Sequence, residues 1–417
     1  VKLARVTGEQ KYLDQAKYFV DARGVGENYF MKEMSRPDYK LIFSDFVDYT
    51  PAYSQSDVPV RELKTAEGHA VRAVYLYCAM ADLAEAYQDE GLLSACKTLW
   101  NNIVQKRMYI TGGIGSSGYL ERFTVDYDLP NDSNYSESCA SIGLALFGLR
   151  MAQITGESQY IDVAERALYN TVLAGIALDG KSFFYVNPLE VWPPACMEGT
   201  SKKHVKPIRQ KWFGVACCPP NIARTLASLG QYIYAENSKK KELYVNLFVS
   251  NETELDWNEN KISVKLQTEF PWVNTYSLEI KNVPEGGMDL LLRVPDYAQD
   301  YQVTADGNMY EENKELEKGY RRVHVEKDTR IEVSFAAPAK FVYANPQVRA
   351  DSGKAAIVRG PLVYCLEEID NSQNLPAVFV DTDTALEEEK SDLFGGIVTV
   401  KARGKKIVES SVSNSLY

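Results

Sequence analysis

The residue types best able to do chemistry fall in two short segments of the chain. One segment contains Glu137 and Cys139 as Glu-x-Cys, and the other contains the adjacent pair Cys217 and Cys218. Neighbouring cysteines make a poor disulfide, because the ring that joins them strains the peptide between them. Three thiols and one carboxylate are instead a suitable ligand set for a single tetrahedral Zn²⁺. A thiolate in such a set could also act as a nucleophile.

Local sequence places both segments at the start of helices. Pro219 and Pro220 follow the cysteine pair and suit a first helical turn, where the positive end of the helix dipole lowers the pKa of a thiol. Asn134 stands three residues before Glu137, which is the spacing of a capping box. Glu137 therefore has a second interpretation as a capping residue, and Cys139 has one as a small buried hydrophobic residue.

A metal-bound thiolate needs a good electrophile, because the metal withdraws charge from the sulfur. The anomeric carbon of a sugar becomes one when its leaving oxygen is protonated by a carboxyl group that burial or nearby negative charge keeps protonated. We expect Glu121, in the glycine-rich loop 111–123, to be that acid. The alternatives are that Glu121 forms a surface ion pair with Arg122, and that Asp126 or Asp128 is the acid.

His69 and Tyr185 are further candidates for contact with a sugar. His69 is one of three histidines and stands at an expected helix start, where a histidine more often caps the helix or packs in the core. Tyr185 lies in a strand-like excursion between helices, where it could donate a hydrogen bond or simply pack. Trp192 and Trp212 offer aromatic faces for a sugar ring, although core packing is the simpler interpretation.

The hydrophobic pattern divides the chain at about residue 238. Before this point apolar residues recur at helical spacing, and a Thr-Gly-Glu segment at 7–9 is repeated at 155–157, which indicates a series of helical hairpins. We expect residues 1–238 to form a catalytic α/α toroid that could be incomplete at its N-terminus. Short alternating strands predict a β-sandwich over residues 239–417, so the expected class is α+β with several domains.

Composition limits the partners of the chain. The sequence has 57 acidic and 46 basic residues and a net charge of −11, which argues against nucleic acid or a membrane surface as a partner and favours a neutral glycoside or oligosaccharide. No stretch reads as a membrane-spanning segment. Seven cysteines without disulfide-framework spacing indicate free thiols and a cytoplasmic location, with the periplasm as the alternative because the chain does not begin with Met. A homodimer is among the expected assemblies.

Four stretches together resemble glycoside hydrolase family 127, the β-L-arabinofuranosidase family that was once a domain of unknown function. They are Ile110–Phe123, Asp126–Ala140, Ala174–Glu190 and Trp212–Arg224. The adjacent cysteines combined with Glu-x-Cys make the resemblance specific, whereas the glycine loop alone would not. The resemblance covers most of the chain and implies an α/α toroid followed by β-sandwich domains. Family members have glycine where this chain has Leu120.

The resemblance also implies roles for particular residues. The implied Zn²⁺ ligands are Glu137, Cys139, Cys217 and Cys218. Cys217 would attack the anomeric carbon and Glu121 would act as acid and then base, so that configuration is retained through a thioglycosyl-enzyme. The residues that match sugar-contacting positions are His69, Tyr185 and Glu137.

The expected function is a retaining exo-glycosidase that releases β-L-arabinofuranose or a related sugar from plant-derived glycans. One alternative is a carboxylate-pair glycosidase or lyase that uses Glu121 with Asp126 or Asp128 and has a structural zinc ion. Another is a non-catalytic carbohydrate-binding protein whose thiols and metal only join two helices. A zinc peptidase is disfavoured because the chain has no His-Glu-x-x-His.

Overall fold

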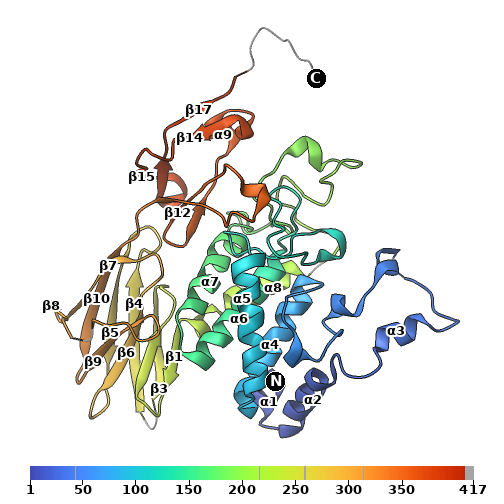
Figure 1. Ribbon diagram of the computed structural model, residues 1–417. Coiled ribbons are helices and arrows are strands. Elements are labelled where there is room, and N and C mark those ends of the chain that lie inside the picture. The colour runs from blue at the N-terminus through green and yellow to red at the C-terminus, as the bar shows by residue number, and fades with distance from the viewer. Residues whose placement is uncertain (43, 216, 258–259, 313, 409–417) are drawn as a thin grey trace.

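The computed structural model describes residues 1–42, 44–215, 217–257, 260–312 and 314–408. Helices fill the first part of the described chain, two larger sheets follow, and smaller groups of strands come last (Figure 1). The protein is therefore a mixed helical and strand protein with several domains, in agreement with the change in hydrophobic period.

Most helices of this part pack against a neighbour in the chain. Its α-helices are α1 (Lys2–Thr7), α2 (Gln10–Ala22), α3 (Tyr29–Met34), α4 (Ala70–Tyr87), α5 (Glu90–Asn102), α6 (Ser138–Thr155), α7 (Gln159–Ala167) and α8 (Cys218–Ala227). Helix α4 packs against α5 and α6, and α6 also packs against α7 and α8. The apolar pattern predicts helix as far as Ile233, but α8 ends at Ala227 and a short 3₁₀ turn over Leu229–Tyr232 follows.

The repeated Thr-Gly-Glu segment forms the same turn in both of its copies. Each helix ends at a glycine with left-handed backbone, Gly8 after α1 (φ 71°) and Gly156 after α6 (φ 68°). In both copies the threonine hydroxyl donates to a carbonyl oxygen four residues earlier at 2.8 Å and accepts the glutamate amide hydrogen at 3.2 Å. Because glycine adopts this backbone conformation at little cost, the sequence determines where each hairpin turns.

Helix α6 lies at the centre of the helical core. Small residues let its neighbours approach closely: a Cβ on Gly143 would lie 2.3 Å from Val74 of α4, and one on Gly148 would lie 2.8 Å from Trp100 of α5. Contrary to the expectation from sequence, α6 has the length and composition of a membrane-spanning helix. However, 78% of it is buried inside the protein, which is the behaviour of a core helix.

The two larger sheets share one hydrophobic core. The four-stranded sheet has the order β1 (Tyr234–Asn237), β2 (Glu242–Val245), β6 (Met288–Arg293), β9 (Tyr320–Val325). The six-stranded sheet has the order β3 (Asn251–Trp257), β4 (Asn260–Thr268), β5 (Thr275–Lys281), β10 (Thr329–Ala336), β7 (Gln299–Ala305), β8 (Asn308–Met309). Neighbouring strands are antiparallel except β2 and β6, which are parallel. Alternate residues such as Ile262, Val264 and Leu266 of β4 enter the shared core, as the period of two predicts.

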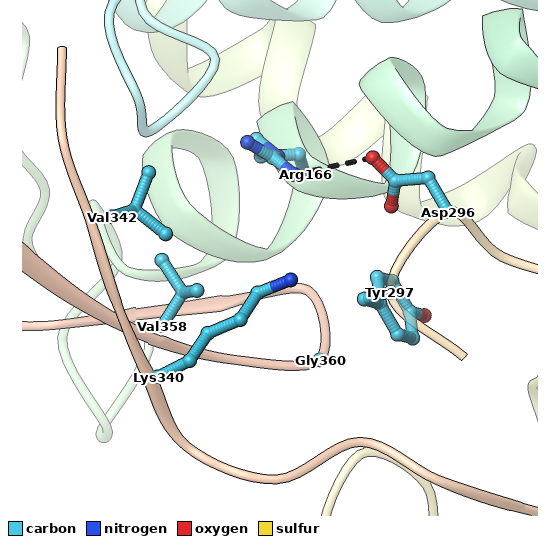
Figure 2. A pocket seen from close by; sticks show the side chains of 7 residues that line it. All are labelled: Arg166, Asp296, Tyr297, Lys340, Val342, Val358 and Gly360. Atoms are coloured by element: carbon cyan, nitrogen blue, oxygen red, sulfur yellow. Dashed lines mark ion pairs between the residues drawn. The ribbon is translucent and has the colours of Figure 1, made fainter. Parts of the chain in front are cut away.

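Smaller strand groups follow and contact the helical part through α7 and its continuation. They are β11 (Lys340–Val342), β12 (Ala356–Arg359) and β13 (Leu362–Tyr364) in one sheet, β14 (Val378–Val380) with β17 (Gly404–Lys406), β15 (Glu387–Ser391) with β16 (Ile397–Lys401), and the short helix α9 (Glu368–Asn371). A cavity of about 170 Å³ lies at this boundary. In its wall, a guanidinium nitrogen of Arg166 on α7 lies 3.8 Å from a carboxylate oxygen of Asp296, and the Lys340 side chain faces Tyr297 (Figure 2).

A buried arginine joins the helical part to the first β core. Arg293, at the end of β6, is fully buried, and its guanidinium donates to Asp162 at 2.6 Å and to Glu165 at 2.5 Å on α7. Tyr297 donates to the second oxygen of Glu165 at 2.7 Å. Buried charges are tolerated when they are paired in this way, so the network specifies how α7 sits on the sheet.

Replacement of this arginine should destabilise the fold. In Arg293→Met, Asp162 and Glu165 lose their cation while they remain buried, and we expect the free energy of unfolding to fall by about 3–5 kcal/mol. The matched control is Arg330→Met, because Arg330 is 49% exposed and its ion pairs with Glu279 and Glu332 contribute about 0–1 kcal/mol. Urea unfolding of both variants measures the difference. Equal losses would show that the buried network does not stabilise the boundary.

Candidate active site

The two sequence segments that carry the cysteines meet in one cluster. The Sγ atoms of Cys139 and Cys218 are 3.5 Å apart, and those of Cys217 and Cys218 are 3.9 Å apart. Oε1 of Glu137 lies 3.2 Å from the Cys217 sulfur and 3.7 Å from the Cys218 sulfur. Although about eighty residues separate the segments, one ligand atom from each of the four residues lies within 4.8 Å of the others.

Two helix N-termini bring these side chains together. Cys217 is the residue before the first turn of α8, which begins at Cys218 with proline in its first turn, as the sequence predicts. Glu137 holds the same place before α6, but its side chain makes no capping hydrogen bond. The capping-box interpretation of Glu137 is therefore wrong. Its carboxylate turns instead toward the sulfurs, while its backbone forms an antiparallel bridge with Val186.

The donor set fits a tetrahedral metal site. Sulfurs bound to Zn²⁺ at about 2.3 Å with tetrahedral angles lie about 3.8 Å from each other, close to the sulfur separations in the cluster. Glu137 is 2% exposed, and its second oxygen, Oε2, is buried without a hydrogen-bond partner among the described residues. A buried carboxylate oxygen without a partner costs folding free energy, and a cation or a proton bound at Oε2 would remove that cost. Glu137, Cys139, Cys217 and Cys218 could hold such an ion.

Protonation in the cluster is uneven. Burial, followed by the negative charge of Cys217 and Glu121, raises the pKa of Glu137 to about 9. Hydrogen bonds from the thiols of Cys139 and Cys218, together with one from Tyr185, lower the pKa of Cys217. Cys217 is also the exposed member of the cluster, whereas Cys139 and Cys218 are buried. Of the three thiols, the accessible Cys217 is therefore the most readily ionised, because the pKa values of Cys139 and Cys218 are raised.

The predicted acid, Glu121, is held by two hydrogen-bond donors. Nε2 of His69 lies 2.7 Å from Oε2 of Glu121, and the Tyr135 hydroxyl donates to Oε1 at 2.7 Å. Burial raises the pKa of Glu121, but these two hydrogen bonds outweigh it and hold the pKa below its ordinary value. The expectation of a carboxyl group kept protonated in the free protein is therefore wrong. The surface ion pair with Arg122 is also not formed, because the Arg122 side chain donates to the carbonyl oxygen of Phe123.

The loop that carries Glu121 is fixed by its backbone. Ser117 and Arg122 exchange two backbone hydrogen bonds of 3.2 and 3.1 Å, and the Tyr53 hydroxyl donates to the Leu120 carbonyl oxygen. Leu120 (φ 56°) and Glu121 (φ 52°) are both left-handed, which costs about 1–3 kcal/mol for a residue with a side chain. Leu120 stands where members of the resembling family have glycine, the residue that adopts this conformation most easily. The site thus retains strain in order to aim the carboxylate.

His69 serves two structural roles at once. It is the residue before α4, and its Nδ1 accepts the amide hydrogen of Arg72 at 3.4 Å, which is the cap expected for a histidine at a helix start. Because Nδ1 accepts a hydrogen, the proton of the neutral ring is on Nε2, which faces Glu121. The helix cap therefore fixes the tautomer that donates to the acid.

Tyr185 lies against the accessible thiol. Its hydroxyl is 3.1 Å from the Cys217 sulfur, and the residue is 5% exposed. The side chain thus both packs in the core and supplies a polar contact to the site. Trp192 and Trp212 are 67% and 64% exposed, so core packing, the simpler interpretation from sequence, is wrong for both.

The rival acids are placed differently. Asp126 accepts from Arg107 at 2.7 Å, from Asn102 at 3.0 Å and from Lys106 at 3.1 Å, and these contacts occupy both of its oxygens. It therefore anchors its loop to the end of α5. Asp128 is exposed to solvent. Glu137, by contrast, lies within 4.8 Å of Glu121 and His69 as well as of the thiols, so its carboxylate connects the acid to the sulfur cluster.

Family models match three consecutive parts of the chain. The β-L-arabinofuranosidase GH127 catalytic domain matches residues 1–231, which is more than half of the chain. The chain belongs to glycoside hydrolase family 127. The family 127 middle domain matches residues 242–338 and the C-terminal domain matches residues 339–406. The resemblance read from the cysteine and Glu-x-Cys motifs is confirmed.

Several proteins are similar to this family 127 chain. The non-reducing end β-L-arabinofuranosidase of Bifidobacterium longum subsp. longum is 38% identical over 409 residues, which are 96% of this chain and 61% of that protein. A solved GH127 β-L-arabinofuranosidase from Geobacillus stearothermophilus T6 is 44% identical with a TM-score of 0.93, and the match covers 100% of this chain and 65% of that one. A second solved structure, described as a GH127 β-arabinofuranosidase, is 36% identical with a TM-score of 0.84 over 98% and 62%. The chain thus spans less than two thirds of the length of these relatives.

Sequence reasoning missed two residues that line the candidate site. Tyr135 holds Glu121, and the ring of His204 stacks on Tyr135 with centroids 6.4 Å apart. Tyr135 stands two residues before Glu137 in the chain, and this closeness was a usable signal. His204 carries no local signal, because only the tertiary fold brings residue 204 to residue 135.

Proposed function

We propose that this family 127 chain provides the catalytic centre of a retaining exo-glycosidase that releases β-L-arabinofuranose, or a closely related sugar, from plant-derived glycans. The names of the similar proteins support the sugar, and the geometry of Cys217 and Glu121 supports the chemistry. The single observation that carries the proposal is an accessible thiol beside Glu137, whose carboxylate is also within reach of the Glu121–His69 pair.

The finer architecture belongs to the same proposal. We place the site at the mouth of an α/α toroid that is followed by a β-sandwich. The N-termini of α4, α6 and α8 supply His69, Glu137 and Cys217, and such convergence of helix starts is expected at the open end of a toroid. Glu137, Cys139, Cys217 and Cys218 would hold Zn²⁺, and the ion when bound supplies the positive charge that keeps the thiols ionised.

In the first step the Cys217 sulfur forms a bond to the anomeric carbon while the bond from that carbon to the leaving oxygen breaks. Glu121 transfers its proton to the leaving oxygen. Because hydrogen bonds keep this carboxyl ionised in the free protein, a proton must be taken up first. The Glu121 side chain is 31% exposed, so a bound sugar would remove water from it and raise its pKa toward the protonated form.

In the second step water attacks the anomeric carbon of the thioglycosyl-enzyme and the carbon–sulfur bond breaks. Glu121, now ionised, accepts the proton of the water, and its hydrogen bonds from His69 and Tyr135 favour that ionised state. Two displacements at the same carbon retain its configuration. His69, Tyr185 and Glu137 surround the reacting atoms and would contact hydroxyl groups of the sugar.

Substitution of the proposed nucleophile separates this mechanism from its rivals. We expect Cys217→Ser to lower kcat/KM for a nitrophenyl β-L-arabinofuranoside by roughly 10³-fold or more, because an oxygen at this position is a far weaker nucleophile. Zinc content is measured on the same sample, and Cys365→Ser is the matched control because that exposed cysteine lies outside the cluster. A near-normal rate in Cys217→Ser would favour a carboxylate-pair enzyme with structural zinc. Absence of turnover by the intact protein on every furanoside would favour a binding protein.

Substitution of the acid distinguishes Glu121 from the other carboxylates. We expect Glu121→Gln to lower kcat by about 10²–10⁴-fold on a methyl furanoside, and by less on a nitrophenyl furanoside, whose leaving group needs little protonation. Asp128→Asn tests the rival acid, and Glu326→Gln is the control, since Glu326 is an exposed carboxylate between β9 and β10, outside the site and the cavity. A loss in Asp128→Asn as large as that in Glu121→Gln would support the carboxylate pair instead.

A further inference from the structure

A second cavity lies beside the loop that carries Glu121. Its volume is about 530 Å³, which is within the range of about 300–1,000 Å³ typical of ligand pockets. One wall is formed by the loop itself, and the opposite wall by residues 200–204. The lining includes Ser116, Ser117, Tyr119, Thr200, Ser201 and His204.

The lining suits a neutral polyhydroxylated ligand. Hydroxyl groups from serine and threonine side chains dominate it, and Tyr119, which is 46% exposed, adds an aromatic ring on which a sugar could stack. The charged residues of the wall, Asp128 and Lys203, have opposite signs. Burial lowers the pKa of His204, so its ring is neutral at pH 7 and does not attract an anion. Its Nε2 donates to the Ser133 carbonyl oxygen at 3.1 Å, so Nδ1 of the neutral ring carries no proton.

Both walls of the cavity are tied to Glu121. Tyr119 and Glu121 belong to the same short 3₁₀ turn, so the first wall continues directly into the acid. On the second wall His204 stacks on Tyr135, and Tyr135 donates to Glu121. The two segments approach each other at Gly118, where a Cβ would lie 3.2 Å from the His204 ring. Glu121 itself is not in the lining, so the cavity lies next to the turn and the aromatic stack that hold the acid.

The sulfur cluster lies elsewhere. Among the described residues, the cavity lining includes neither Cys217 nor Tyr185, the residue that contacts its sulfur. In a retaining glycosidase the nucleophile approaches the anomeric carbon from the face opposite the leaving oxygen, and the acid lies beside that oxygen. A cavity next to the turn that holds the acid, and apart from the nucleophile, is in the position of the leaving group.

We propose that the cavity between Tyr119 and His204 binds the leaving-group part of the substrate, as a neutral oligosaccharide of one to a few sugar residues. This inference rests on the proposed function. Tyr119 stacks on the first sugar of the leaving group, and the hydroxyl groups of Ser201 and its neighbours bond its hydroxyls. The enzyme thereby selects substrates by the chain to which the released sugar is attached.

The test compares two leaving groups on one released sugar. The substrates are methyl β-L-arabinofuranoside, whose leaving group is too small to fill the cavity, and a trisaccharide with the same non-reducing end sugar. Ser201→Tyr fills the cavity from an exposed position, and Tyr119→Ala removes the stacking ring. Ser94→Tyr is the matched control, because Ser94 is an exposed residue of α5 outside the cavity.

We expect the ratio of kcat/KM for the trisaccharide to kcat/KM for the methyl furanoside to fall about tenfold or more in Ser201→Tyr and in Tyr119→Ala, and to stay the same in Ser94→Tyr. A circular-dichroism melt of each variant verifies that it is folded. An unchanged ratio in both folded variants overturns the leaving-group site while the proposed function stands. A wild-type protein that turns over neither substrate overturns the proposed function and this site with it.

Discussion

Burial of the Glu137 carboxylate among three thiols is the constraint on which the site depends. A candidate metal ligand stands at the N-terminus of α6 and another at the N-terminus of α8, and the packing of α8 on α6 sets the distance between them. A carboxylate that is 2% exposed and has one unpartnered oxygen is stable only with a cation or proton beside it. The rest of the helical core, above all the close packing of α6 against α4 and α7, holds these two helix ends in register.

Backbone strain and hydrogen bonding together set the position of the Glu121 carboxylate. Two consecutive left-handed residues turn the carboxylate inward, and the backbone bonds between Ser117 and Arg122 keep that turn closed. Two donors, one fixed by a helix cap at His69 and the other by the aromatic stack of Tyr135 on His204, then hold the two carboxylate oxygens separately. The loop is rich in glycine, but these contacts hold the Glu121 carboxylate in one position.

Much of this arrangement could be predicted from the sequence, because it depends on local signals. Proline after the cysteines marked the start of α8, Thr-Gly-Glu marked two hairpin turns, and the change of period marked the strands. What failed depends on contacts between distant segments. The lowered pKa of Glu121 depends on His69 and Tyr135, which lie 52 positions before it and 14 after it in the chain. The capping-box prediction failed because the Glu137 side chain contacts the thiols and its backbone pairs with Val186, and neither interaction can be read from the local sequence.

The convergence of Glu137, Cys139, Cys217 and Cys218 on one ion is tested most directly by X-ray absorption at the zinc edge on protein purified with zinc. The proposed site predicts one zinc ion per chain, with a first shell of three sulfurs at about 2.3 Å and one oxygen at about 2.0–2.2 Å. A shell made only of nitrogen and oxygen, or protein that retains no zinc, would contradict it.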